Sequence, residues 1–212
     1  MVQVDLKVGV KNAMVCMCGT TLDMDKDRFH LCNCSKTKPA RTRRHHLLKR
    51  FLGNLLEEHG AKDVQWEPTM HSDDGTAPSR DDIADIKLTF PSTSAQPEFI
   101  DISIIHSAAT SNLGGQYPTL NSALRNMEMM KHQRYEHTVE SRTGRFTAFV
   151  VDYTGRLGQE ARQLLLRWFP HEERRQLLGY PQLVDILQGK IGTIMAKFNA
   201  SMEKEAIERT FG

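Results

Sequence analysis

The feature that most constrains the fold is a strand-like segment that carries a carboxylate among apolar residues. Residues 99–105 alternate, so that Asp101 and Ser103 share one face while isoleucines occupy the other. An unpaired carboxylate is costly to bury among apolar side chains. The segment therefore predicts either an edge strand whose polar face meets water or a buried acid that has a partner.

A second acidic group lies upstream, at the start of the preceding predicted strand. Asp82 precedes Asp101 by nineteen residues. Two strands joined as a hairpin can bring such carboxylates together, and a divalent cation can offset their repulsion. Asp85 stands only three residues after Asp82, so the first cation ligand is either Asp82 or Asp85.

Composition bounds the architecture. With 212 residues, 39% of them hydrophobic and 25% charged, the chain can build one sizeable core, or one domain with a small appendage. No apolar run approaches the roughly 20 residues of a membrane span, and residues 1–11 lack the apolar core of a signal peptide. We therefore expect an intracellular protein without a membrane partner.

Basic residues are concentrated in one short segment. A formal net charge of +2 does not by itself imply a nucleic-acid partner, but residues 41–50 contain five Lys or Arg in ten positions. This density is typical of a surface that contacts phosphates, and it also suits a solvated helix start. The candidate DNA-binding residues are Arg41, Arg43, Arg44, His45, Lys49 and Arg50.

Hydrophobic periodicity predicts the order helix, three strands, helix, strand, helices. This order indicates an α/β (α+β) fold with a mixed central sheet of about four strands flanked by helices. The predicted helices span residues 43–60, 119–139, 157–169, 172–178 and 181–208, and the predicted strands span 64–67, 83–90, 98–106 and 145–152.

All four cysteines lie between positions 16 and 34, whereas a secreted disulfide scaffold would distribute them through the fold. Two close thiols and a second pair of ligands 10 to 15 residues later can close a tetrahedral zinc site. The candidate Zn²⁺ ligands are Cys16, Cys18, His30 and Cys34, with Cys32 as an alternate. The simpler interpretation is four reduced cysteines, which does not explain their clustering.

The acid pair is similar to the metal site of PD-(D/E)XK nucleases, which place a lysine two residues after the second acid. Here that position is Ser103, which carries no charge. The next predicted helix offers a substitute in Lys131, and Tyr135 lies four residues later on the same face. We expect this helix to lie across the hairpin and bring both side chains to the acids.

Several motifs together resemble the restriction-like endonuclease domain that follows the reverse transcriptase in site-specific non-LTR retrotransposons. No single motif is specific, but the ordered set over residues 16–170 is. In chain order the motifs are Cys16-Met17-Cys18-Gly19 with Leu22-Asp23, His30 with Cys34, Arg44-His45, Trp66-Glu67-Pro68, Arg80-Asp81-Asp82-Ile83, Asp101-Ile102-Ser103-Ile104-Ile105-His106, Lys131 with Arg134-Tyr135, and Phe149-Val150-Val151-Asp152 with Gly155-Arg156-Leu157-Gly158.

The resemblance implies a zinc knuckle over residues 1–42, a restriction-endonuclease-like core over 43–170 and a helical extension over 171–212. It also implies a nuclear enzyme that uses Mg²⁺ or Mn²⁺ to nick a target DNA duplex, so that the freed 3′-hydroxyl primes reverse transcription of the element's RNA. A reverse transcriptase domain would then belong to a longer chain. The proline usual before the first acid is replaced by Asp81.

In this interpretation Asp82 (or Asp85) and Asp101 hold the catalytic metal, and Glu67 is a third acid. Lys131 positions the attacking water, and Tyr135 orients the lysine or a phosphate. The alternative is a catalytically inactive nuclease-fold module that docks nucleic acid. Ser103 favours that alternative, whereas the acids and Lys131 oppose it.

Overall fold

The computed structural model describes residues 13–16, 18–23, 30, 34–71, 83–90, 94–106, 120–138, 143–168 and 183–211. From residue 38 onward the order of its elements agrees with the predicted order, whereas the two short strands before that residue were not predicted. The predicted helix 172–178 lies outside the described residues. The elements are β1 (Ala13–Val15), β2 (Thr21–Asp23), the 3₁₀ helix η1 (Ser35–Thr37), α2 (Lys38–Glu58), β3 (Lys62–Trp66), β4 (Ile86–Phe90), β5 (Ser94–Ile105), α4 (Leu120–Tyr135), β6 (Arg145–Asp152), α6 (Gln159–Trp168) and α8 (Leu183–Phe211).

Four strands form a mixed sheet in the order β3-β4-β5-β6. The first three are antiparallel, and β6 lies parallel to β5, with Asp101 paired with Ala148. Because β5 lies between β4 and β6, Asp101 is on an interior strand. The edge-strand interpretation is therefore wrong, and Asp101 is the buried acid that needs a partner.

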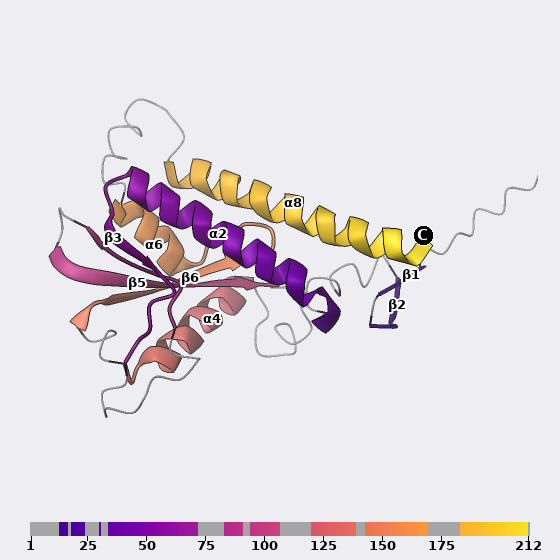
Figure 1. Cartoon of the computed structure of the whole chain (residues 1–212), viewed down its shortest axis with the longest axis horizontal. Coiled ribbons are helices and arrows are strands. Elements are labelled where there is room, and N and C mark those ends of the chain that lie inside the picture. Colours follow the sequence, from indigo (N-terminus) through magenta and orange to yellow (C-terminus); the bar gives the residue numbers. More distant parts are fainter. Residues whose placement is uncertain are drawn as a thin grey trace, which may run out of the picture.

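Helices cover both faces of the sheet. Figure 1 shows α2 and α8 side by side on one face and α4 across the opposite face. The main core lies under α2, α6 and α8 and includes Ile100 and Ile102 of β5. Phe99 and Ile105 of the same strand pack in the smaller clusters on the α4 side. The predicted alternation of β5 is therefore confirmed, and it directs Asp101 toward α4.

Helix α2 forms because its apolar residues recur at helical spacing and a proline stands in its first turn, where the missing N–H costs nothing. It begins at Lys38, five residues before the predicted start, and it ends at Glu58, shortly before Gly60. The helix thus crosses the predicted boundary between residues 42 and 43. Its buried leucines are Leu48, Leu52, Leu55 and Leu56.

Helix α8 packs along α2 and also contacts β1. Met202 of α8 packs on Ala40 of α2, and the amide oxygen of Asn199 accepts a hydrogen bond of 2.9 Å from the guanidinium of Arg44. The first and last described elements therefore meet (Figure 1). Among the described residues, no helix is both long and apolar enough to cross a membrane.

Candidate functional site

The cysteine segment begins with a tight turn after β1. The amide of Gly19 donates to the carbonyl of Cys16 at 2.8 Å, and the amide of Cys16 donates to the carbonyl of Thr20 at 2.9 Å. Gly19 has φ of +89°, in the left-handed region that glycine adopts without strain. The turn places the thiols of Cys16 and Cys18 on the same side.

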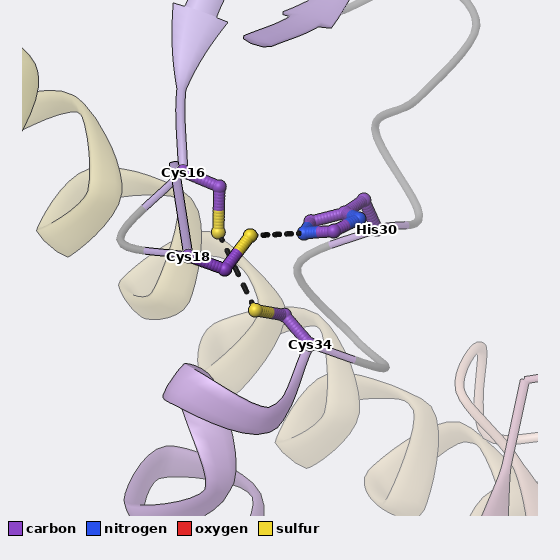
Figure 2. Close-up of side chains that lie close together, drawn as sticks. All are labelled: Cys16, Cys18, His30 and Cys34. Atoms are coloured by element: carbon purple, nitrogen blue, oxygen red, sulfur yellow. Dashed lines mark hydrogen bonds between the residues drawn. The ribbon is translucent and has the colours of Figure 1, made fainter. Parts of the chain in front are cut away.

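The second pair of ligands is placed by one helical turn. The amide of Cys34 donates to the carbonyl of His30 at 2.8 Å, and Cys34 leads directly into η1 and α2. Figure 2 shows the four side chains pointing toward one another. Their ligand atoms all lie within 4.8 Å of one another, with 3.5 Å between the sulfurs of Cys16 and Cys34 and 3.2 Å between Cys18 Sγ and His30 Nε2.

These distances fit a tetrahedral zinc ion. Zn–S bonds of ~2.3 Å at tetrahedral angles place two sulfurs about 3.8 Å apart. The observed separation of 3.5 Å is far too long for a disulfide, whose sulfurs lie ~2.05 Å apart. Cys16, Cys18, His30 and Cys34 could therefore hold zinc, and Cys32 lies outside the described residues.

The two thiols of the first turn differ in acidity. Burial raises the pKa of Cys16 to about 11, whereas hydrogen bonding to Thr20 lowers the pKa of the exposed Cys18 to about 6. Cysteine binds metal as thiolate. Metal binding at neutral pH must therefore remove a proton from Cys16, and metal affinity should rise with pH.

A second site lies where α4 crosses β5. Lys131 Nζ lies 2.5 Å from Oδ2 of Asp101, and the hydroxyl of Tyr135 lies 3.4 Å from its Oδ1. The same hydroxyl donates to the backbone carbonyl of Ile83 at 3.0 Å. The helix thus brings both predicted side chains to Asp101, because residues four apart lie on one helical face.

Burial dominates the electrostatics of Asp101. It raises the pKa of the carboxyl above its usual range, although the nearby Lys131 ammonium acts in the opposite direction. Burial also raises the pKa of Tyr135, and the Asp101 carboxylate adds to the effect. Tyr135 therefore remains a neutral phenol at physiological pH. Such a perturbed, buried acid is a candidate functional group.

Asp85 provides a carboxylate immediately before β4. Its Oδ2 accepts a 2.7 Å hydrogen bond from the amide of Ile102 and lies 3.2 Å from Nε2 of His45. Burial alone would raise the pKa of Asp85, but the hydrogen bonds from His45 and Ile102 lower it. Asp85 is therefore an ionised carboxylate next to β5. Asp82 lies outside the described residues.

His45 Nε2 also lies 3.1 Å from the carbonyl oxygen of Ile102. Both of its neighbours accept hydrogen bonds, so Nε2 must carry the proton. The hydrogen bond to Asp85 raises the pKa of His45, and burial opposes the rise.

Lys49 links Glu67 to Asp85, because its ammonium group lies near both carboxylates. Lys49 Nζ lies 2.5 Å from Oε1 of Glu67 and 3.8 Å from Oδ1 of Asp85. The hydrogen bond from Lys49 lowers the pKa of Glu67. Glu67 has φ of +53°, an uncommon backbone conformation for a residue other than glycine. Its amide donates to the carbonyl of Asp85 at 3.0 Å, which fixes the two residues side by side.

The three acids Glu67, Asp85 and Asp101 do not form a tight cluster in this structure. Within the described ranges, the group at Cys16 is the one set of three or more His, Cys, Asp or Glu side chains close enough to hold a metal. Lysine ammonium groups lie at the carboxylates: Lys131 at Asp101, and Lys49 at Glu67 and Asp85. A divalent cation at these acids would have to replace those contacts.

The density of basic residues in segment 41–50 does not predict that His45 and Lys49 contact the acids. Their spacing carries a usable signal, however, because His45, Leu48, Lys49 and Leu52 fall at i, i+3, i+4 and i+7, on one face of α2. Polar groups on the apolar face of a helix indicate buried partners. Here the partners are Asp85, immediately before β4, and Glu67, immediately after β3.

The other basic residues of α2 are placed differently. Arg44 is buried against α8, while Arg43 is exposed and pairs with Glu205 at 3.1 Å. Arg50 is exposed and Arg41 is partly buried. His106 is buried at the end of β5 and stacks on Tyr153, with 4.1 Å between ring centroids.

Comparison with protein families provides no further assignment. No family model matches the chain, and no curated protein matches it. The geometry of the acid site and of the cysteine cluster therefore carries the functional proposal.

Proposed function

We propose that this chain is a divalent-metal-dependent DNA endonuclease whose active site is built from β4, β5 and α4. The observation that carries the proposal is the pair formed by Lys131 and Asp101, 2.5 Å apart. A strand acid of this nuclease class needs a lysine nearby, and the strand itself offers Ser103 at that position. Helix α4 supplies the lysine from outside the strand.

The architecture supports the same class. The order α2, β3, β4, β5, α4, β6 consists of a helix, an antiparallel meander, a second helix and a strand parallel to the third. This arrangement suits a restriction-endonuclease-like core, as the sequence resemblance implies. It also brings the start of β4 next to the middle of β5, where the two carboxylates lie.

The carboxylate donors support the choice of Mg²⁺ or Mn²⁺ in this proposal. The amide of Asp85 donates to the carbonyl of Ile100 at 3.0 Å, and Asp101 follows Ile100 in β5; hard cations prefer carboxylate oxygens such as those of the two aspartates. A bound cation would supply positive charge at the scissile phosphate and lower the pKa of a water molecule. We assign Asp85 as the first ligand because its carboxylate is held by the Ile102 amide of the strand that carries Asp101.

Each remaining side chain has a role in the proposal. Lys131 holds the attacking water and balances negative charge that develops on the phosphate. Tyr135, a neutral hydrogen-bond donor fixed to the carbonyl of Ile83, orients Asp101 and Lys131. Glu67 is an outer acid that keeps Lys49 beside Asp85.

In this proposal, exposed arginines contact the DNA. Arg43 and Arg50 lie at the surface of α2, where they can contact phosphates. Zinc at the cysteine cluster would stabilise the turn that leads into this helix. By its resemblance, the enzyme would act in the nucleus and nick one strand of a target duplex to prime reverse transcription.

Nicking of supercoiled plasmid tests the proposal. Wild-type protein with Mg²⁺ or Mn²⁺ should convert supercoiled plasmid to open circles, while Asp101→Ala and Asp85→Ala should not. Gln133→Ala, an exposed change on α4, is the matched control and should nick at the wild-type rate. If wild type leaves plasmid intact with either metal, or if Asp101→Ala nicks as fast, the proposal is wrong.

A second candidate is a nuclease-fold module that docks nucleic acid without cutting it. The observation in its favour is that lysines already neutralise the acids, as in a site that no longer needs a cation. Such a module should bind duplex DNA equally well with and without Mg²⁺. Metal-dependent nicking that is lost in Asp101→Ala would exclude it.

A further inference from the structure

A large polar cavity lies along the N-terminal half of α4, whereas the acid site lies at the C-terminal half of the same helix. It has a volume of about 990 Å³ and is bordered by α4, by the loop between β6 and α6, and by the first turns of α8. Glu128 is the last residue of α4 that lines the cavity, and its Oε1 accepts a 2.9 Å hydrogen bond from the amide of Glu160 on α6. Lys131 and Tyr135 leave the same helix toward Asp101.

The wall of the cavity is formed by the turn Thr154 to Gly158, which two glycines press against the neighbouring helices. A Cβ on Gly155, at φ of +94°, would lie 2.3 Å from the Cα of Gly192 on α8. A Cβ on Gly158 would lie 2.3 Å from Oε1 of Glu128 on α4. Arg156 stands between these two contacts, so its backbone is held at the cavity wall.

Three arginines line the cavity: Arg125 from α4, Arg156 from the turn and Arg162 from α6. Arg162 lies 3.5 Å from Asp185, which offsets its charge. Within the described part of the chain, no carboxylate pairs with Arg125 or Arg156, and both are exposed. The other acid, Glu128, is buried and engaged with the first turn of α6. Among the residues that the structure describes, the cavity therefore has two positive charges without a carboxylate partner.

The remaining lining suits a polar polyanion. Amide side chains of Asn121, Gln159 and Gln188 contribute donors and acceptors, which can bond base edges or sugars. The volume is at the upper end of the ~300–1,000 Å³ typical of small-molecule sites, so it exceeds the need of a single phosphate. Arginines contributed by separate elements can contact different phosphates of one strand.

We propose that this cavity binds the phosphodiester backbone of a single-stranded nucleic acid through Arg125 and Arg156. The site is separate from the acids that would cut DNA, and the inference does not depend on the proposed nuclease activity.

Fluorescence anisotropy with a 20-nucleotide 5′-fluorescein RNA, and with the DNA of the same sequence, tests the site in protein without added Mg²⁺ or Mn²⁺. The double variant Arg125→Ala/Arg156→Ala should bind at least tenfold more weakly than wild type. Its plot of log affinity against log salt should be shallower by about 1.4, because single strands lose ~0.7 per phosphate contact. Arg156→Lys keeps the charge and should retain most of the affinity.

Lys197→Ala is the matched control, because it removes an exposed charge of α8 outside the cavity. It should bind like wild type, and circular dichroism melting should show all variants folded. Unchanged affinity in the double variant, or an equal loss in Lys197→Ala, would overturn the proposal. The proposal would also be overturned if a nucleoside monophosphate displaced the labelled strand as well as the unlabelled strand does at the same concentration.

The two proposals can fail separately. Asp101→Ala should bind the labelled strand normally even though it does not nick plasmid. If wild type binds the strand through Arg125 and Arg156 but never nicks plasmid, the nuclease proposal fails and the cavity proposal stands.

Discussion

Lys131 Nζ lies 2.5 Å from Oδ2 of Asp101, although thirty residues and a change from strand to helix separate the two. The contact forms because α4 returns across the sheet before β6 joins β5 in parallel. A parallel neighbour requires such a crossover, and here the crossover helix carries a functional side chain. The position of the lysine is thus set by the topology of the sheet.

The first prediction concerns Lys131. Lys131→Ala should lower the nicking rate by about 10²–10⁴-fold, because it removes the group that positions the attacking water. Lys131→Arg should recover only part of the rate, since the guanidinium cannot adopt the position of the ammonium. Single-turnover nicking at saturating Mn²⁺ measures both. Wild-type rates in Lys131→Ala would remove Lys131 from the mechanism and leave the role of the acids open.

The second prediction concerns stability at Asp101. Because burial raises the pKa of Asp101 in the folded protein, the native state binds this proton more tightly than the unfolded state does. Stability then falls as pH rises from the ordinary aspartate pKa of ~3.9 through the raised value, and it stays reduced at neutral pH. Without added Mg²⁺ or Mn²⁺, Asp101→Asn should therefore melt at or above the wild-type temperature at pH 7.

Added metal should reverse that order. A cation at 100 times its dissociation constant stabilises the folded state by about 2.7 kcal/mol, which corresponds to roughly 5–10 °C for a chain of this length. Thermal denaturation with and without Mn²⁺ should show this rise for wild type and not for Asp101→Asn. An equal rise in both proteins would show that the metal binds elsewhere.

The third prediction concerns zinc. Purified protein should contain one zinc ion per chain, and Cys16→Ser or Cys34→Ser should lower that content strongly, because each removes a converging thiolate. Cys32→Ser is the matched control and should retain the metal. Elemental analysis after gel filtration measures the ratio. Loss of zinc in Cys32→Ser but not in Cys34→Ser would move the fourth ligand to Cys32.

The fourth prediction concerns His45. The hydrogen bond to Asp85 raises the pKa of His45 above its ordinary value of ~6.5. The stability that this pair contributes is therefore fully present below pH ~6.5, and it is lost as pH rises through the folded pKa. His45→Gln should cost about 1–2 kcal/mol at pH 6 and clearly less at pH 9. Urea unfolding at the two pH values measures the difference. His46→Gln, at an exposed position of the same helix, is the control and should cost less than His45→Gln at pH 6.

The fifth prediction concerns the turn between β6 and α6. Gly155→Ala should destabilise the protein by about 2–4 kcal/mol, because the residue has φ of +94° and its Cβ would meet the backbone of α8. Gly189→Ala is the matched control, because the Cβ meets nothing within 4 Å inside a helix. It should stabilise by about 0.5–1 kcal/mol. Equal unfolding free energies in the two variants would mean that the turn does not pack on α8.

The order of elements was predictable because apolar residues alternate or recur at helical spacing within each one. Boundaries were less predictable. Helix α2 starts at Lys38 rather than at residue 43, since its first turns are basic and carry no apolar signal. Strand β5 starts at Ser94 rather than at the predicted residue 98, although the added segment contains Pro97. Pro97 is tolerated because residues 94–97 of β5 pair with β4 alone, before pairing with β6 begins at Glu98.

The candidate site was predictable where one local rule applied. Lys131 and Tyr135 share a helical face, and both reach Asp101. The contacts of His45 and Lys49 with Asp85 join α2 to β4 and β5, and sequence spacing does not encode such long-range pairs. The burial of Arg44 likewise depends on Asn199, 155 positions away.

The contact of α8 with β1 and α2 has a consequence for synthesis on the ribosome. The N-terminal turn emerges first, yet the helix on which it rests is the last described element to be made. Until α8 emerges, the side of α2 that receives Met202 remains uncovered. We expect a nascent chain halted before residue 183 to be sensitive to proteases along α2, and the completed chain to be resistant there.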